Sequence, residues 1–261
     1  MDILIPVITL GTLGLVFGIG LAVASRRLTV QMDERLEKIM GLLPGSNCGA
    51  CAKAGCFGLA ETLLAGEASA DVCRVSEEKV KEEIARLLGQ KIEKKAKLTA
   101  TLHCNGGRRV ADKFLYSGLE DCVAANLLLG GAKNCVWGCL GLSTCVQVCP
   151  FDAIHMSDER LPVVDEKKCR ACNKCVLACP KKLFTLTPSK SRVYVGCSSC
   201  DIGKDTRAVC SVGCIACRKC EQVCSFDAIH VFDNLAGIDY VKCNSCGECV
   251  KVCPMKTIRI R

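Results

Sequence analysis

The sequence predicts an α+β protein with a single N-terminal transmembrane helix, a small cysteine-rich domain and two tandem cysteine-rich modules. Three observations support this prediction: an uncharged apolar stretch at the N-terminus, 25 cysteines among 261 residues, and an order of motifs that occurs twice after residue 98. Aromatic residues make up only 4% of the chain, so they cannot supply a large core. A cysteine content near one residue in ten is typical of chains that rely on thiol chemistry for stability.

The N-terminal stretch from Ile3 to Ala24 contains no charged side chain. About 20 apolar residues suffice to cross a bilayer, so residues 1–27 are predicted to form a membrane anchor. Two arginines follow the stretch, and this charge favours the cytoplasmic side for the bulk of the chain. A cleaved signal peptide is the alternative, but Asp2 and the lack of a basic residue before the stretch argue against it.

The composition also limits the classes of partner. A reducing cytoplasm disfavours a disulfide framework and favours metal thiolates. The net charge of +8 does not indicate a nucleic-acid partner, because no basic block with interleaved aromatic residues occurs. Metal-bound cysteines are thiolates, so bound metal centres would offset much of the positive charge.

Residues 28–75 are predicted to hold a juxtamembrane amphipathic helix over 32–43 and a small metal-binding domain. Four cysteines of this domain have the spacing C-x2-C-x4-C-x16-C among several glycines. Such a backbone-rich loop suits an iron–sulfur cluster, because amide groups can donate to its sulfurs. A zinc site is the alternative. The predicted ligands are Cys48, Cys51, Cys56 and Cys73.

Residues 76–98 are predicted to form a linker helix. Val80, Ile84 and Leu88 recur at helical spacing and make one apolar face. Ser76 is suited to cap the first turn. We expect this helix to act as a spacer between the small domain and the modules.

The two modules, residues 99–190 and 191–261, follow the same plan. Each begins with a β-rich segment that ends in cysteine, at 98–104 and 192–197. Each continues to a cysteine block that closes in CPFDAIHM or CSFDAIHV and ends with a proline-terminated block. This order indicates an internal duplication.

The proline-terminated blocks have the spacing C-x2-C-x2-C-x3-C-P, which is the run of bacterial ferredoxins for [4Fe–4S] clusters. Three cysteines of such a run hold one cluster, and the fourth reaches the neighbouring cluster. The cysteine blocks ahead of these runs, at 135–149 in the first module and 214–224 in the second, are called the upstream blocks. Crossed ligation between each run and its upstream block predicts four clusters. Their ligand sets are Cys149, Cys169, Cys172 and Cys175; Cys135, Cys139, Cys145 and Cys179; Cys214, Cys217, Cys220 and Cys253; and Cys224, Cys243, Cys246 and Cys249.

Together with the small domain, these sets predict about five [4Fe–4S] clusters. The set with Cys135 has stretched spacing, and Ser225 replaces the proline of the second upstream block. Five cysteines remain, and the duplication pairs Cys104 with Cys197 and Cys122 with Cys210. Two two-cysteine sites, a disulfide in each module, a sixth cluster and inert thiols all remain open. None of the five is assigned as a ligand: Cys104, Cys122, Cys197, Cys200 and Cys210.

The order of these features resembles the B subunit of Rnf-type ion-translocating ferredoxin:NAD oxidoreductase complexes. The resemblance rests on the anchor followed by LLPGSNCGACAKAGCFGLAE (42–61), LHCNGG (102–107), CVWGCLGLSTCVQVCPFDAI (135–154) and the ferredoxin runs. It implies single-electron transfer between soluble ferredoxin and the other membrane and peripheral subunits. In the complex, this transfer is coupled to NAD reduction and to translocation of Na⁺ or H⁺ across the plasma membrane.

No nucleotide-binding or hydrolase motif occurs in the sequence. We therefore expect catalysis to belong to the complex and no independent active site in this chain. Two alternatives remain: a stand-alone membrane-tethered polyferredoxin that donates electrons, and a structural zinc scaffold protein.

Overall fold

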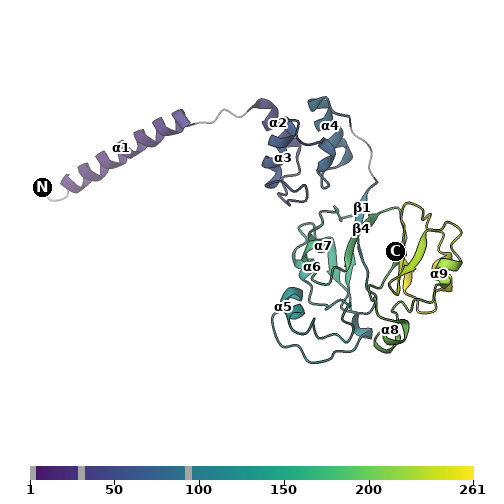
Figure 1. Ribbon diagram of the computed structural model, residues 1–261. Coiled ribbons are helices and arrows are strands. Elements are labelled where there is room, and N and C mark those ends of the chain that lie inside the picture. Colours follow the sequence, from purple (N-terminus) through teal and green to yellow (C-terminus); the bar gives the residue numbers. More distant parts are fainter. Residues whose placement is uncertain (1–3, 29–32, 92–95) are drawn as a thin grey trace.

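The computed structural model describes residues 4–28, 33–91 and 96–261 (Figure 1). Helix α1 (Leu4–Leu28) lies apart from the rest of the chain, at the purple end of the ribbon. Its segment Val7–Leu28 is long and apolar enough to cross a membrane, and none of the segment is buried. An apolar helix without a protein core around it is suited to lipid, in agreement with the predicted anchor.

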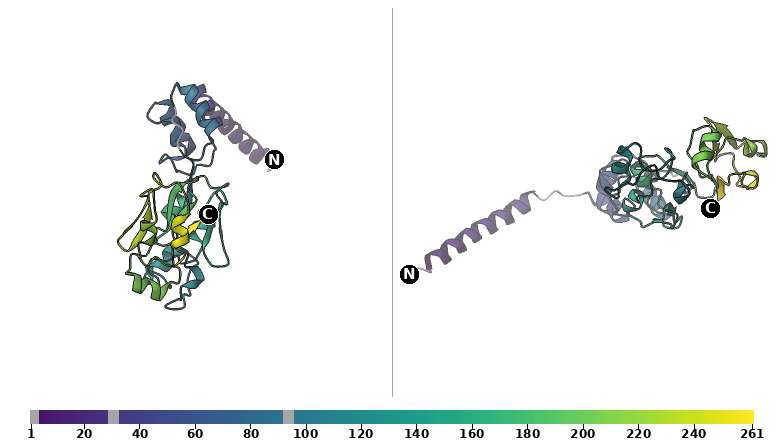
Figure 2. Two further views of the ribbon diagram at one scale, coloured as in Figure 1. Left: turned by 90° about the vertical axis from the view of Figure 1, so that its right-hand side faces the viewer. Right: turned by 90° about the horizontal axis from the view of Figure 1, so that it is seen from below.

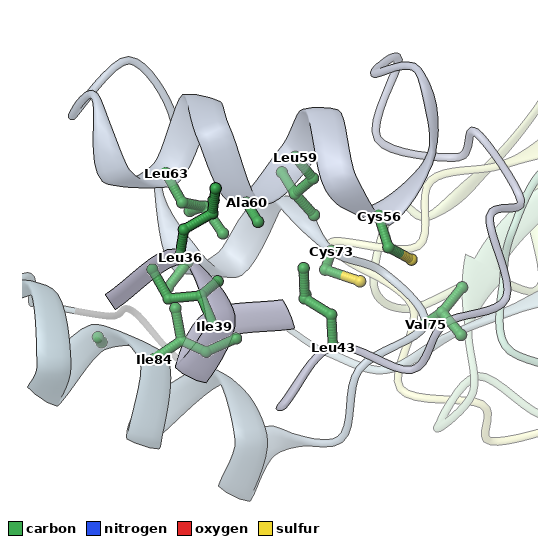
Figure 3. Close-up of a cluster of buried hydrophobic side chains, with 12 residues drawn as sticks. Leu36, Ile39, Leu43, Cys56, Leu59, Ala60, Leu63, Cys73, Val75 and Ile84 are labelled. Carbon is green, nitrogen blue, oxygen red and sulfur yellow. The ribbon is translucent and has the colours of Figure 1, made fainter. Parts of the chain in front are cut away.

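The small domain packs three helices around an aliphatic core. These are α2 (Glu34–Leu42), α3 (Gly55–Leu64) and α4 (Glu78–Leu88), with a short 3₁₀ turn η1 (Ala70–Val72) between the last two. Ile39, Leu59 and Ile84 come from the three different helices and are each 1% exposed (Figure 3). A helix is present where the prediction placed one over 32–43, and Asp33 caps it by accepting from the Arg35 amide at 2.8 Å.

Helix α4 is shorter than the predicted 76–98 and has another role. Gly89 ends it in the left-handed conformation, with φ of 65°. Glu77 holds the N-cap position, and the hydroxyl of Ser76 instead donates to Cys73 Sγ at 3.1 Å. Because Ile84 is buried in the small-domain core, the helix is part of that domain rather than a free spacer. Residues 92–95 of the predicted helix lie outside the described residues.

Residues 98–260 contain one order of elements twice. The first repeat contains β1 (Leu98–Leu102), η2 (Gly107–Arg109), α5 (Cys122–Leu127), α6 (Thr144–Gln147), β2 (Ile154–Met156), β3 (Pro162–Val164), α7 (Lys174–Ala178) and β4 (Phe184–Pro188). The second contains β5 (Val193–Val195), α8 (Gly203–Val209), α9 (Lys219–Gln222), β6 (Ile229–Phe232), β7 (Leu235–Ile238), α10 (Glu248–Val252) and β8 (Ile258–Ile260). This mixture of short helices and strands confirms the α+β prediction at the level of content.

Each repeat pairs its first strand with its last and closes a hairpin between its helices. β1 pairs with β4 and β5 with β8, both antiparallel, with Ala100 opposite Leu186 and Tyr194 opposite Arg259. β2–β3 and β6–β7 are the hairpins. The outer pairing places the cysteine that follows the first strand close to the beginning of the last strand of its own repeat.

The two repeats lie side by side, with their first strands near the junction (Figures 1 and 2). His103 connects them, because its Nδ1 lies 2.8 Å from the carbonyl oxygen of Val195 and its Nε2 lies 2.7 Å from the hydroxyl of Thr185. At the C-terminus, Arg261 pairs with Glu166 of the first repeat at 3.3 Å. The junction is therefore a polar, hydrogen-bonded contact.

Candidate metal centres

Three cavities in the repeats are each lined by four cysteines. The sets are Cys149, Cys169, Cys172 and Cys175; Cys214, Cys217, Cys220 and Cys253; and Cys224, Cys243, Cys246 and Cys249. Each set joins three cysteines of one block to the last cysteine of the other block. The structure thus brings together three of the four crossed sets that the spacing predicts.

The backbone around these cysteines is shaped for sulfur. Residues between the ligands adopt positive φ, for example Asn173 with 70° and Ser245 with 63°, and so the loops wrap tightly. The fourth cysteine of a block accepts from the amide four residues later. Amide-to-Sγ distances are 3.4 Å for Leu183 to Cys179, 3.4 Å for Ala228 to Cys224, and 3.3 Å for Thr257 to Cys253. Such N–H···S bonds favour the thiolate and tune a bound cluster.

Burial has a marked effect on these thiols. Burial first, and neighbouring cysteine thiolates second, raise the pKa of Cys175 and of Cys220 to about 12. Several thiolates cannot share a buried cavity without a cation to offset their repulsion. The cysteine sets therefore fit a cationic metal centre, and its uptake must release the thiol protons.

A zinc site and an iron–sulfur cluster need different arrangements of their ligands. Within residues 4–28, 33–91 and 96–261, no group of three or more Cys, His, Asp or Glu side chains is suited to one metal ion. A zinc site draws its ligands to within about 2.3 Å of one atom. A [4Fe–4S] cluster distributes four thiolates over four irons. The repeated C-x2-C-x2-C-x3-C-P spacing is the feature that favours the cluster.

The stretched set is only partly assembled as predicted. Cys139, Cys145 and Cys179 lie together, but their additional neighbour is Cys122. Burial, together with the nearby thiols of Cys122 and Cys179, raises the pKa of Cys145 to about 12. Cys135 lies elsewhere, in a buried cluster with Val110 and Cys210. The structure thus places Cys122, rather than Cys135, beside the other three predicted ligands.

Local hydrogen bonds position Cys122 at the first turn of α5. The carboxylate of Asp121 caps this helix by accepting from the Ala124 amide at 2.8 Å. The hydroxyl of Thr144 accepts from the Cys122 amide at 2.7 Å and donates to Asp121 at 3.0 Å. Because Thr144 directly precedes Cys145, the bonds tie two cysteines of the set to one another.

A signal for this arrangement is present in the sequence. Aligning CVWGCLGLSTCVQVCP (135–150) with CSVGCIACRKCEQVCS (210–225) pairs Cys135 with Cys210 and Cys139 with Cys214. Leu142 then occupies the position of Cys217. The first upstream block therefore matches the regular block of the second repeat, except that Leu142 replaces its middle cysteine. Cys135, like Cys210, lies ahead of this regular block. The predicted pairing of Cys122 with Cys210 missed this correspondence.

The four predicted cysteines of the small domain gather at one end of its core. Cys56 and Cys73 are buried there, next to Val75 (Figure 3), and Cys48 and Cys51 pack against the same cluster. The Asn47 side chain accepts from the Cys56 amide at 2.8 Å. Gly55, with φ of 80°, is required here because a Cβ would lie 2.7 Å from Asn47 Oδ1.

The small-domain cysteines adjoin those of the first repeat. Cys172 and Phe151 of the repeat pack against the small-domain core. Burial raises the pKa of Cys172, and the thiol of Cys48 is close enough to raise it further. A cavity of about 710 Å³ between the two parts is lined by both Cys51 and Cys169. The two sets are therefore neighbours.

Comparison with known proteins agrees with these centres. The family model for an Fe-S cluster domain matches residues 43–75. The model for a 4Fe-4S dicluster domain matches twice, at 132–184 and 213–258. The five cysteines without a predicted role lie outside all three matches.

Curated relatives align over nearly the whole chain. The B subunit of the Na(+)-translocating ferredoxin:NAD(+) oxidoreductase complex of Acetobacterium woodii is 45% identical over 98% of this chain and 77% of its own length. The B subunit of the ion-translocating oxidoreductase complex of Methanosarcina acetivorans is 40% identical over 97% and 96%. The B subunit of the proton-translocating ferredoxin:NAD(+) oxidoreductase complex of Clostridium ljungdahlii is 38% identical over 93% and 86%.

Proposed function

The chain belongs to the family of B subunits of ion-translocating ferredoxin:NAD oxidoreductase complexes, and we propose that it conducts single electrons through a row of [4Fe–4S] clusters in such a complex. The contact between neighbouring cysteine sets is the observation that carries this proposal. Cys48 of the small domain lies near Cys172, and Cys175 of that second set lies near Cys145 of the stretched set. A row of adjoining sets suits stepwise electron transfer.

When bound, each cluster supplies a one-electron couple. The residues of this chain hold and tune it. Thiolates of crossed cysteines fix its position, and amides such as those of Leu183 and Thr257 donate to the ligand sulfurs. Burial limits solvent around the sulfurs, and these two factors set the reduction potential. The chain offers no independent active site in this proposal, and NAD reduction belongs to the complex.

The proposed organisation keeps the predicted order of parts and assigns helix α4 to the small domain. Residues 1–27 anchor the chain in the plasma membrane, with the bulk of the chain on the cytoplasmic side. The small domain, residues 28–75 together with helix α4, holds the membrane-proximal cluster. It is followed by two ferredoxin-like modules at 99–190 and 191–261, each with two crossed clusters. Soluble ferredoxin and the other subunits are the proposed electron partners. Translocation of Na⁺ or H⁺ is then a property of the assembled complex.

In the first module, Cys122 is proposed as the ligand that joins Cys139, Cys145 and Cys179. The carrying observation is its place beside Cys145, fixed through Thr144. The small-domain cluster is held by Cys48, Cys51, Cys56 and Cys73. All other ligands of the ferredoxin-type sets remain as the spacing predicts.

Iron analysis of the full chain tests this function. The chain would be purified anaerobically in detergent, and iron, sulfide and zinc would be measured. We expect at least five clusters, or about 20 irons per chain, and low-potential EPR signals in a redox titration. Reduced ferredoxin should reduce them without another subunit. Fewer than about eight irons per chain, with zinc making up the difference, would contradict the proposal and favour the zinc scaffold.

A further inference from the structure

Two cysteines outside the ferredoxin-type sets meet at the junction of the repeats. Cys104 follows strand β1 of the first repeat, and Cys197 follows β5 of the second. The backbone next to Cys104 is hydrogen-bonded to the backbone next to Cys197, because the Asn105 amide donates to the carbonyl oxygen of Gly196 at 2.9 Å. The Ser198 hydroxyl also donates to the carbonyl oxygen of His103 at 2.9 Å. The cysteine after each first strand thus faces the same junction.

Two more cysteines reach this junction from the upstream blocks. Cys135 and Cys210 are buried together in one cluster with Val110. A Cβ placed on Gly106 would lie 3.6 Å from Cys210 Sγ and 3.7 Å from Cys104 Sγ, so these two sulfurs flank the same point. Glycine at this position leaves the space between them open.

The thiols also affect one another. Burial raises the pKa of Cys135, and the thiols of Cys104 and Cys210 raise it further. Burial raises the pKa of Cys197 to about 11, with smaller increases from Cys214 and Cys104. Cys104 is therefore a near neighbour of all three others, since it also raises the pKa of Cys210.

The backbone at these cysteines has the form found at the ferredoxin-type ligands. At Cys172 and Cys243 the amide two residues later donates to the thiol. The same bond occurs from Trp137 to Cys135, from Val212 to Cys210 and from Ser199 to Cys197. Cys104 accepts from the amide of Cys139 at 3.4 Å. Inert buried thiols have no need of such donors, whereas metal thiolates gain from them.

We propose that Cys104, Cys135, Cys197 and Cys210 hold a further [4Fe–4S] cluster between the two repeats. Each repeat contributes two ligands from equivalent places, one after its first strand and one ahead of its upstream block. The proposal rests on the proposed function for the kind of metal centre. Arg109 lies close enough to lower the pKa of Cys210 and would offset part of the negative charge. Cys200 alone of the 25 cysteines then has no ligand role.

This site would connect the two halves of the electron path. The Cys139 amide bonds to Cys104, and the Cys214 amide bonds to Cys197. Cys139 belongs to the first-repeat set and Cys214 to the second, so the junction adjoins one cluster on each side. One electron would arrive from one neighbour and leave to the other, with no bond formed or broken.

Native mass spectrometry of the anaerobically reconstituted full chain tests the count. We expect six clusters in the most fully loaded species, with about 24 irons, and five with about 20 if the junction holds none. A maximum of five would overturn this inference and leave the proposed function standing. A chain with zinc and no iron would overturn both. Because this measurement uses the natural chain, it does not depend on whether any variant folds.

Variants then locate the additional cluster. Cys104→Ala and Cys210→Ala should each lose about four irons and keep the EPR signals of the others. Cys200→Ala, at the cysteine that has no proposed ligand role, should lose none. The double variant of Cys104→Ala and Cys210→Ala should lose no more iron than either single variant, because both residues bind the same cluster. The double variant of Cys104→Ala and Cys122→Ala should lose about eight irons, because two clusters are affected. Full iron in Cys104→Ala, or a loss of only about four irons in the double variant of Cys104→Ala and Cys122→Ala, would overturn the assignment.

Discussion

The two repeats share one order of elements but complete their first cluster in different ways. The second repeat has a regular block, in which Cys214, Cys217 and Cys220 are close in sequence and line one cavity. The first repeat has Leu142 in place of the middle cysteine, and Cys122 of helix α5 lies beside the remaining two. The comparison shows that a ligand set is defined by position in space, and that a distant segment can supply a missing thiol.

The segment that supplies Cys122 also marks the main structural difference between the repeats. Between its first strand and its upstream block, the first repeat inserts η2, α5 and their loops, whereas the second has only α8. The insertion costs little in loop entropy, since that cost rises slowly with length. The first repeat therefore tolerates a long insertion in which one residue has become a ligand.

Of the substitutions that separate the two repeats, the loss of Cys122 should have the largest effect. Cys122→Ala should remove one cluster, or about four irons per chain, because the other three thiolates leave one iron without a protein ligand. Adding Leu142→Cys should restore the regular spacing of the second repeat and recover the iron. Iron analysis and EPR of the full chain measure both changes.

Cys217→Ala provides the matched loss in the second repeat and sets the size expected for a regular ligand. If Cys122→Ala kept all its iron and Cys135→Ala lost the first-repeat cluster, the stretched spacing would be the true ligand set. If Leu142→Cys failed to restore iron, the alignment of the two blocks would not extend to the ligand positions.

A smaller effect is expected from His103, which connects the repeats. The equivalent position in the second repeat is Gly196, where a Cβ would lie 1.9 Å from the Asn105 side chain. His103→Ala removes the imidazole contacts to Val195 and Thr185 and should cost about 1–3 kcal/mol in the stability of the junction. Hydrogen exchange of strands β1 and β5 in the full chain should become faster.

His155→Ala is the control, because His155 is exposed on hairpin β2–β3. This variant should leave the hydrogen exchange of strands β1 and β5 at the junction unchanged. Equal acceleration in both variants would mean that the junction does not depend on the imidazole of His103.

The sequence is informative where chemistry fixes spacing. The ferredoxin runs must wrap three thiolates around one cluster, so their spacing alone predicted three sets that the structure brings together. The juxtamembrane helix and the strands before Cys104 and Cys197 were also predictable, because their apolar patterns have regular periods. These features depend on local geometry.

The sequence is less informative where packing decides. Cys122, and not Cys135, lies beside the other cysteines of the stretched set, because the insertion that contains helix α5 folds back onto α6. No periodic pattern within a short stretch of sequence predicts this contact. Likewise, Ser76 has the composition of a helix cap but donates to Cys73, and the core contact of Ile84 makes α4 part of the small domain. The alignment of the two upstream blocks was available in the sequence, but it gains its meaning from the cysteines that the fold brings together.

The smallest effect concerns the residue that positions Cys122. Thr144 is buried, and its hydroxyl accepts from the Cys122 amide at 2.7 Å. Thr144→Val keeps the shape but leaves that amide without its partner, at a cost of about 1–3 kcal/mol. The cluster should still form, since no thiolate is removed. Under challenge with an iron chelator, the first-repeat cluster should be released faster than in the natural chain, by up to about tenfold for each 1.4 kcal/mol.

Lys219→Ala is the matched control, because Lys219 holds the equivalent place before Cys220 and is exposed. Its second-repeat cluster needs no such bond, since Cys217 is already held by the loop between Cys214 and Cys220. We therefore expect chelator release from Lys219→Ala to equal that of the natural chain. Equal release from both variants would mean that the cluster itself orders Cys122, and that the first turn of α5 forms only as the metal is taken up.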